Sequence, residues 1–157
     1  MLKKWPYYND LIELISNKFG DEYKVVTAPG PSEINDAKDI NALALLDNGR
    51  ALDISQLTSL IKNSSFVIAN DTGPAHLSIA LGTPTVVIVG GGHFGSFVPY
   101  PEEVRPPLAR FIFEDMPCYH CFWRCNKRES KQESFPCVNN VSVDAVWEHT
   151  KELLSAV

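Results

Sequence analysis

The sequence predicts an α/β fold with a mostly parallel sheet and helices on both of its faces. Short apolar runs rich in β-branched residues alternate with amphipathic segments along the 157 residues. Runs of this length and composition are typical of strands buried in a parallel sheet. Glycine and proline separate the segments. Because strands that alternate with helices form βαβ units, we expect one such sheet in a single domain.

The N-terminal part of the chain begins with a predicted helix. Apolar residues recur at helical spacing over residues 7–19, which therefore form an amphipathic helix. A β-branched run at 23–28 is closed by a Pro-Gly-Pro loop and is a predicted strand, and a weaker helix follows at 34–46. Residues 52–54 are a candidate short strand, and Ser55 is the predicted cap of the next helix.

The clearest strand of the chain lies near its middle. Residues 66–69 form a buried strand by composition, and residues 70–73 form a tight loop after it. A helix then spans 74–81 with a proline in its first turn. The remaining predicted elements are a strand at 85–89 that ends at three glycines, a strand at 110–113, an irregular Cys-rich segment at 114–140 and a final amphipathic helix at about 142–154.

Charge and composition exclude several classes of protein. The net charge of −5 argues against a nucleic-acid partner, because such proteins usually carry a basic face. No apolar run approaches the roughly 18 residues that a membrane span needs, and the N-terminus lacks the apolar stretch of a signal peptide. We therefore expect a cytoplasmic protein, in which a metal site or free thiols are favoured over disulfides.

The loop at 70–73 is the most informative part of the sequence. A buried strand leads into Asp71, Thr72 and Gly73, and a helix starts there. The first amides of a helix lack internal partners and its dipole favours negative charge, so this turn is a candidate diphosphate site. His76 lies about one helical turn further on. The alternative is that Asp71 or Thr72 is a simple helix cap and His76 a packed side chain.

Residues 70–77, Asn-Asp-Thr-Gly-Pro-Ala-His-Leu, and residues 80–84, Ala-Leu-Gly-Thr-Pro, carry a family resemblance. Together they resemble the signature of glycosyltransferase family 9, the ADP-heptose:lipopolysaccharide heptosyltransferase-like enzymes. Residues 3–6, 53–60 and 90–95 are similar to further segments of that family and follow in the same order. The resemblance therefore spans almost the whole chain.

The resemblance implies a fold and a set of donor-binding residues. Residues 1–157 would be the Rossmann-like C-terminal half of a GT-B glycosyltransferase, which binds a nucleotide-diphosphate sugar, with ADP-heptose favoured. By position, Lys4 would face a donor phosphate and Asp71 the donor sugar. The diphosphate would contact Thr72, Gly73 and His76. His93 is a further candidate in the glycine-rich loop. The alternative for Lys4 is a solvated surface lysine, and the alternative for His93 is an ordinary loop histidine.

The chain departs from the family pattern because it begins at the Lys-Lys-Trp-Pro segment. In the family, the N-terminal domain supplies the catalytic base and most contacts to a glycan or protein acceptor. We therefore expect no catalytic residue in these 157 residues and expect a missing domain or partner chain. The full enzyme could associate peripherally with a membrane.

The alternative function is a non-catalytic module that binds a nucleotide or recruits a partner. A dehydrogenase domain is disfavoured because no G-x-G-x-x-G follows the first strand.

The four cysteines form a separate candidate site. Their spacing is C-x2-C-x3-C-x11-C, at Cys118, Cys121, Cys125 and Cys137. Clustered thiols are natural ligands for zinc or iron once they ionise. The segment resembles the tail of a family 9 subset that binds iron through four cysteines, which implies a structural iron or zinc. Free thiols and disulfides remain the alternatives, and His120 would be surplus to a tetrahedral set.

Overall fold

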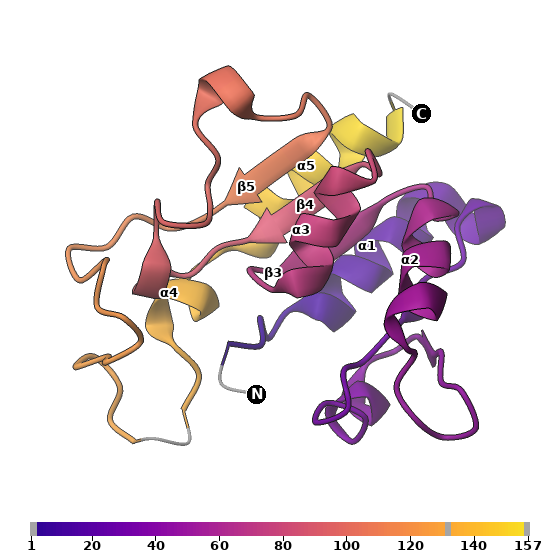
Figure 1. Ribbon diagram of the computed structural model, residues 1–157, viewed down its shortest axis with the longest axis horizontal. Coiled ribbons are helices and arrows are strands. Elements are labelled where there is room, and N and C mark those ends of the chain that lie inside the picture. Colours follow the sequence, from indigo (N-terminus) through magenta and orange to yellow (C-terminus); the bar gives the residue numbers. More distant parts are fainter. Residues whose placement is uncertain (1–2, 131–132, 156–157) are drawn as a thin grey trace.

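The computed structural model describes residues 3–130 and 133–155. The strands are short and all pair in parallel: β1 pairs with β2, and β4 lies between β3 and β5 (Figure 1). The predicted α/β class with a mostly parallel sheet is therefore confirmed. In order, the helices and strands are α1 (Tyr8–Phe19), β1 (Val26–Thr27), β2 (Leu43–Ala44), α2 (Ile54–Lys62), β3 (Val67–Asn70), α3 (Gly73–Ala80), β4 (Thr85–Ile88), β5 (Ala109–Ile112), α4 (Pro136–Asn139) and α5 (Val143–Ser155).

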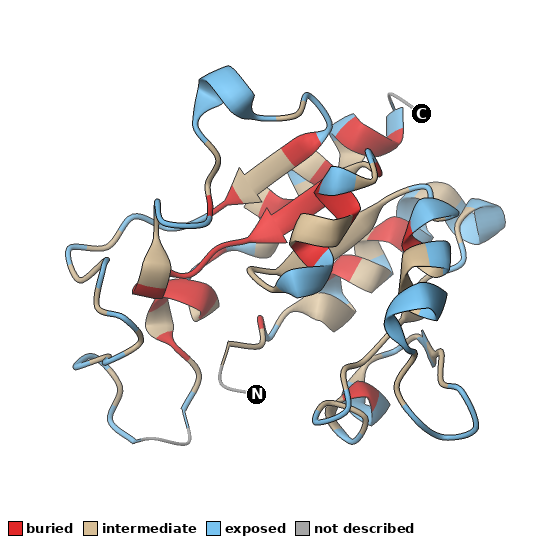
Figure 2. Cartoon of the chain, in the orientation of Figure 1, coloured by how far each residue is buried: buried red, intermediate tan, exposed pale blue. Residues whose placement is uncertain are grey.

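Helices cover both faces of the β3–β4–β5 sheet, as the sequence predicts. Successive side chains of a strand point to opposite faces. Val86 and Ile88 of β4 accordingly join a core cluster with α1 and α5, whereas Val87 joins a second cluster with Ala75 and Ile79 of α3. Buried residues concentrate along β4 and on the helix sides turned towards it (Figure 2). The central strand thus holds two hydrophobic layers together.

The predicted helix at 34–46 is wrong. The chain forms only a 3₁₀ turn over Asp36–Asp39, and Ile40 is already extended. Leu43 and Ala44 then form β2, which pairs in parallel with β1, and the Leu45 amide donates to the Thr27 carbonyl at 2.8 Å. Pairing with a distant strand has therefore overridden a weak local helical pattern. The strand predicted at 23–28 forms, but it is shorter than predicted and spans Val26–Thr27.

The start of α2 also differs from the prediction. Residues 52–54 form no strand, and Ser55 is not the cap. Asp53 is the N-cap: its carboxylate accepts from the Gln56 amide at 2.8 Å, and the Gln56 side chain accepts from the Asp53 amide at 2.9 Å. This reciprocal capping box satisfies two amides that the helix leaves open, so the helix begins at Ile54.

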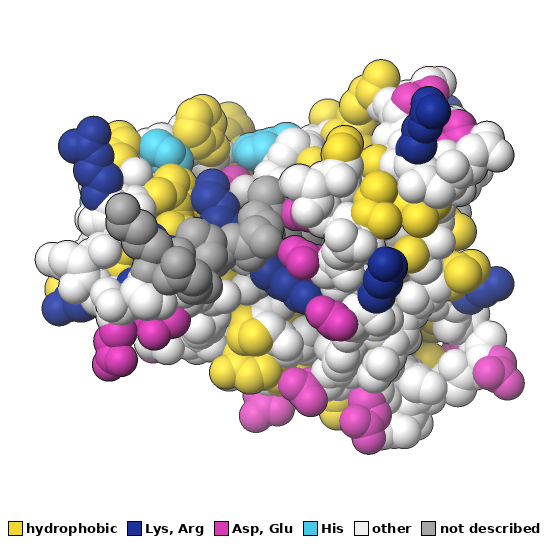
Figure 3. Space-filling view, turned by 90° about the horizontal axis from the view of Figure 1, so that it is seen from below, with side chains coloured by type: hydrophobic (Ala, Val, Ile, Leu, Met, Phe, Trp, Pro, Cys, Tyr) yellow, Lys and Arg dark blue, Asp and Glu magenta, His cyan; other side chains and the backbone are white. Residues whose placement is uncertain are grey.

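The surface carries charges of both signs. On the face seen from below, acidic and basic side chains are interspersed among hydrophobic ones (Figure 3). This face is therefore not a continuous basic surface of the kind that binds nucleic acid. Among the helices of residues 3–130 and 133–155, none is both long and apolar enough to cross a bilayer.

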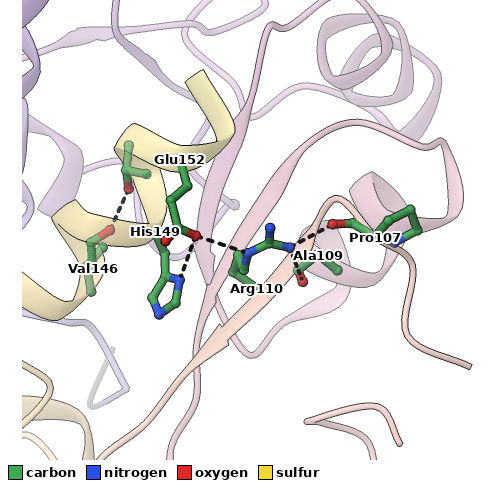
Figure 4. Close-up of polar contacts among 7 residues, drawn as sticks. Pro107, Ala109, Arg110, Val146, His149 and Glu152 are labelled. Atoms are coloured by element: carbon green, nitrogen blue, oxygen red, sulfur yellow. Dashed lines mark hydrogen bonds and ion pairs between the residues drawn. The ribbon is translucent and has the colours of Figure 1, made fainter. Parts of the chain in front are cut away.

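Polar contacts attach α5 to the edge strand β5. The Arg110 guanidinium of β5 lies 3.7 Å from the Glu152 carboxylate of α5, and His149 lies 3.4 Å from the same carboxylate (Figure 4). Arg110 also donates to the Pro107 carbonyl at 2.7 Å. These partly exposed ion pairs contribute little energy but fix the side chain of Arg110. Between β5 and α5 the described chain is irregular apart from turns and the four-residue helix α4.

Candidate functional site

The turn between β3 and α3 presents free amides to solvent. Asp71 donates its amide to the Ile88 carbonyl at 3.1 Å, which continues the ladder to β4. The amides of the next two residues, Thr72 and Gly73, have no hydrogen-bond acceptor within residues 3–130 and 133–155. A Cβ added at Gly73 would meet no atom within 4 Å, and both Gly73 and Pro74 are exposed. The turn is therefore open, and its amides are available to a ligand.

Thr72 contributes its backbone rather than its hydroxyl proton. It is the N-cap residue of α3 and is extended, with φ −149° and ψ 169°, but its side chain makes no capping hydrogen bond. The hydroxyl instead donates to the Asn70 carbonyl at 3.1 Å, which tightens the turn. Since that proton is engaged, the amide of Thr72 is the group free to meet an anion, and the adjacent N-terminus of α3 adds its positive dipole end.

His76 lies one turn along α3 and contacts two residues beside the open amides. Its Nε2 is 3.7 Å from the carboxylate of Asp71, whose side chain is only 12% exposed. Its Nδ1 lies 2.7 Å from the hydroxyl of Tyr100, in the segment that leads from β4 to β5. Nothing in the sequence around Tyr100 marks it as a site residue. The structure thus places His76 beside Asp71, in the same turn as Thr72 and Gly73, and adds Tyr100. The donor-binding role of these residues stays a prediction.

Tyr100 is held in place from both sides. The Arg105 guanidinium donates to the Tyr100 carbonyl through Nε at 3.3 Å and Nη2 at 3.1 Å. The ring of Tyr100 packs against Phe111 of β5, with centroids 5.2 Å apart. Burial raises the pKa of Tyr100, and the negative charge of Asp71 adds to this increase. The phenol therefore stays protonated at neutral pH and can donate a hydrogen bond.

Lys4 lies at the same edge of the sheet but its amine points elsewhere. Its Nζ is 3.5 Å from the Asp36 carbonyl. The neighbouring Lys3 is fixed more firmly: its carbonyl accepts from the Asn70 amide side chain at 2.5 Å, and its amine lies 4.0 Å from the centroid of the Trp123 ring. Tyr8 donates to the other end of the Asn70 amide at 2.6 Å. The role predicted for Lys4 towards a donor phosphate stays a prediction.

The three glycines after β4 are in contact with aromatic rings. An added Cβ would lie 2.6 Å from Trp123 at Gly90, 2.2 Å from Tyr119 at Gly91 and 2.3 Å from Trp123 at Gly92. The carbonyls of Gly91 and Gly92 accept from the amides of His120 and Phe122 at 2.8 and 2.9 Å. These glycines are needed because the Cys-rich segment packs directly on their main chain.

His93 follows these glycines and is surrounded by aromatic rings. The centroids of Phe97, Phe122 and Trp123 lie 5.8, 5.4 and 6.2 Å from its ring. The side chain is half-buried, and Phe97 and Phe122 are 60% and 66% exposed. No hydrogen bond links His93 to the cluster of His76, Asp71 and Tyr100 in the described parts of the chain. Its donor-binding role also stays a prediction.

The four cysteines all line one small apolar cavity of about 10 Å³, and none forms a disulfide. The Gly91 amide donates to the Cys137 sulfur at 3.3 Å. Burial raises the pKa of the Cys137 thiol, although this hydrogen bond partly opposes the increase. Within the described residues, no three His, Cys, Asp or Glu side chains are already arranged as metal ligands. The donor atoms and the shared cavity suit a thiolate-bound metal, but the ligand geometry is not in place.

Comparison with known proteins identifies the family. No curated protein and no solved structure gives a significant match. The family model described as glycosyltransferase family 9 (heptosyltransferase) matches residues 2–130, which include the open turn, His76, Tyr100 and three of the four cysteines. This match covers far more than half of the 157 residues. The chain therefore belongs to glycosyltransferase family 9.

Proposed function

We propose that this chain is the donor-binding domain of a glycosyltransferase that transfers a heptose-like sugar from a nucleotide-diphosphate sugar to a glycan or protein acceptor. ADP-heptose is the favoured donor. Family membership supports glycosyl transfer in general. One structural observation carries the more specific proposal: at the carboxyl end of β3, the Thr72 and Gly73 amides have no acceptor among the described residues, and a Cβ added at Gly73 would meet no atom within 4 Å. In parallel α/β sheets, ligands bind at this edge.

The chemistry of the turn suits a diphosphate. Two amides at a helix N-terminus offer hydrogen bonds to anionic oxygens, and His76 adds a side-chain donor beside them. Asp71 would repel phosphate, so its part in the proposal is to accept a hydrogen bond from a sugar hydroxyl. Such donors would stabilise the charge that develops on the leaving phosphate, which is the role of the protein in transfer without a metal at the diphosphate.

The catalytic base and the acceptor contacts are proposed to come from another domain or chain. In the described part of the chain, one edge of β3 pairs with no strand, because β4 is the single strand that pairs with β3. Open edges of this kind readily accept another strand. A cytoplasmic location is part of the same proposal, because clustered cysteines that bind a metal or stay as thiols are typical of a reducing compartment.

Calorimetry with ADP, UDP, GDP and ADP-heptose tests donor binding. Gly73→Pro is the sharpest variant because it removes one amide hydrogen, while proline suits the first position of a helix after an extended residue such as Thr72. Losing one hydrogen bond to a charged group should weaken ADP binding at least about tenfold. Gly73→Ala keeps the amide and should weaken binding less. Equal affinity of Gly73→Pro and wild type, with both folded, would contradict the proposal.

Transfer is tested separately from binding. The chain alone should bind ADP-heptose and form no glycoside, and adding the N-terminal domain of a family member should restore transfer. Binding without transfer in the presence of that domain would favour a non-catalytic module instead. Glycoside formation by the chain alone would show that the catalytic base lies within these 157 residues.

We also propose that Cys118, Cys121, Cys125 and Cys137 hold a structural iron or zinc. All four line one cavity of about 10 Å³, which is close to the size of a single bound atom. Protein purified without oxygen should contain about one metal ion per chain, and Cys125→Ser should lose it and unfold at a lower temperature. Ser64→Ala, remote from the cysteines in sequence, is the control. Metal-free protein in which all four thiols react with a thiol reagent would contradict this proposal.

A further inference from the structure

We infer that Tyr100 is a positioning residue that fixes His76 as an Nε2–H donor at the open turn. Nothing in the family match assigns a role to Tyr100. The geometry is direct, since the phenol oxygen lies 2.7 Å from His76 Nδ1. The functional part of the inference rests on the proposed function, because the group that His76 would address is the diphosphate of the donor.

The side chains around His76 decide which of its two ring nitrogens, Nδ1 or Nε2, carries the proton. A neutral imidazole has one N–H and one acceptor nitrogen. The Asp71 carboxylate lies on the Nε2 side at 3.7 Å and can only accept, so it favours a proton on Nε2. The Tyr100 hydroxyl lies on the Nδ1 side and can donate. Both neighbours therefore select the same tautomer: Tyr100 donates to Nδ1, and Nε2–H is left for an anionic oxygen.

The phenol is suited to this task because it remains protonated. Burial is the larger cause of the raised pKa of Tyr100, and Asp71 is the second. Among the described residues, the titratable side chains in contact with His76 are Asp71 in the turn and Tyr100 in the following loop, and Arg105 is hydrogen-bonded to the Tyr100 carbonyl. Arg105 thus holds the main chain of Tyr100, and the phenol in turn holds the imidazole.

The position of His76, which Tyr100 holds, allows its imidazole to act on a ligand at the open turn. His76 is half-exposed, with 36% of its side chain accessible, so its Nε2 can reach a ligand as well as Asp71. It lies on the first turns of α3, which begins at the free Gly73 amide. An imidazole with a free ring rotation would present its N–H there only part of the time. Holding Nδ1 with the phenol removes that freedom before the ligand arrives.

The inference is tested first without nucleotide. The chain contains four histidines, so nitrogen-15 labelling of the imidazoles and the variant His76→Gln identify the His76 signals by NMR. At pH 8, wild-type His76 should show an unprotonated Nδ1 and a protonated Nε2. The variant Tyr100→Phe keeps the aromatic ring but removes the hydroxyl, so His76 should become a mixture of its two neutral tautomers. A wild-type Nδ1 that carries the proton, or a Tyr100→Phe spectrum identical to wild type, would overturn the inference.

The second measurement is the affinity for ADP by calorimetry. Tyr100→Phe should raise the Kd about fivefold, as expected for one misplaced hydrogen bond. The control is Tyr23→Phe, because Tyr23 packs against Phe19 and Phe66 at the opposite end of β3. A shifted tautomer with unchanged ADP affinity would overturn the positioning role. If wild type shows the expected tautomer but binds no ADP, the donor proposal fails while the assignment of the tautomer stands.

Discussion

Gly91 is the position at which a single atom would disturb the contact between the sheet and the Cys-rich segment. A Cβ there would lie 2.2 Å from the Tyr119 ring, and the hydroxyl of that ring is hydrogen-bonded to the Glu114 carbonyl. The ring therefore cannot move aside without losing a contact. Glycine is required at position 91 because two parts of the chain pack closely there, and not because the backbone adopts a conformation that other residues avoid.

The variant Gly91→Ala should destabilise the protein by on the order of 1–3 kcal/mol, which is the usual cost of overpacking. Gly73→Ala is the matched control, because a Cβ at Gly73 meets no atom within 4 Å. Alanine also suits a helix better than glycine, so Gly73→Ala should leave stability unchanged or slightly raised. Urea unfolding of both variants measures the difference. Equal stability of the two would show that Tyr119 does not press on Gly91.

At the scale of single elements, α2 shows how side chains set the start of a helix. Both Asp53 and Ser55 are residue types that cap helices, so residue type alone does not choose between them. The choice depends on Gln56, which reaches back to the Asp53 amide and completes the reciprocal pair. The helix consequently starts two residues earlier than a Ser55 cap would allow.

Replacing Asp53 with alanine should lower the free energy of unfolding by about 1 kcal/mol, the typical value of a helix cap. Ser55→Ala should have almost no effect, because Ser55 is exposed and lies inside the first turn. Thermal unfolding of the two variants under identical conditions checks this. A larger loss for Ser55→Ala than for Asp53→Ala would mean that α2 begins later in solution.

At the scale of the whole molecule, the parallel strands form two separate sheets. β1 and β2 make one, and β3, β4 and β5 make the other. Among the described residues, the strand β3 is hydrogen-bonded to another strand on one side only, whereas β4 is bonded on both sides and is buried along its length. Alternate residues of a strand direct their amides to opposite sides. The Val67 and Asp71 amides bond to Pro84 and Ile88, so the Ile68 amide faces the open edge.

Amide hydrogen exchange should report this asymmetry. Ile68 should exchange at least about tenfold faster than Ala69, because the Ala69 amide lies on the side bonded to β4 while Ile68 has no strand beyond it. The measurement is made on dilute protein by NMR. Equal protection of the two amides would show that another strand, from a second copy or from elsewhere in the chain, covers the edge.

Features that depend on local pattern could be predicted from the sequence alone. It predicted α1, α3, α5 and the strands β3, β4 and β5 to within about two residues, because burial of these elements follows their hydrophobic periodicity. It also identified the family from the run at 70–84, which the match to residues 2–130 confirms. The open turn at Thr72 and Gly73 follows from the same logic, since a strand that leads directly into a helix leaves amides unpaired.

Contacts between residues far apart in the chain could not be predicted from local sequence. Tyr100 meets His76 across 24 positions of sequence, and Gly91 meets Tyr119 because two loops pack together. β2 replaced a predicted helix because β1 was available to pair with it. In each case the favoured conformation depends on a partner that local sequence does not specify. A weak local preference contributes less energy than the contacts that a distant partner supplies, so the partner decides the outcome.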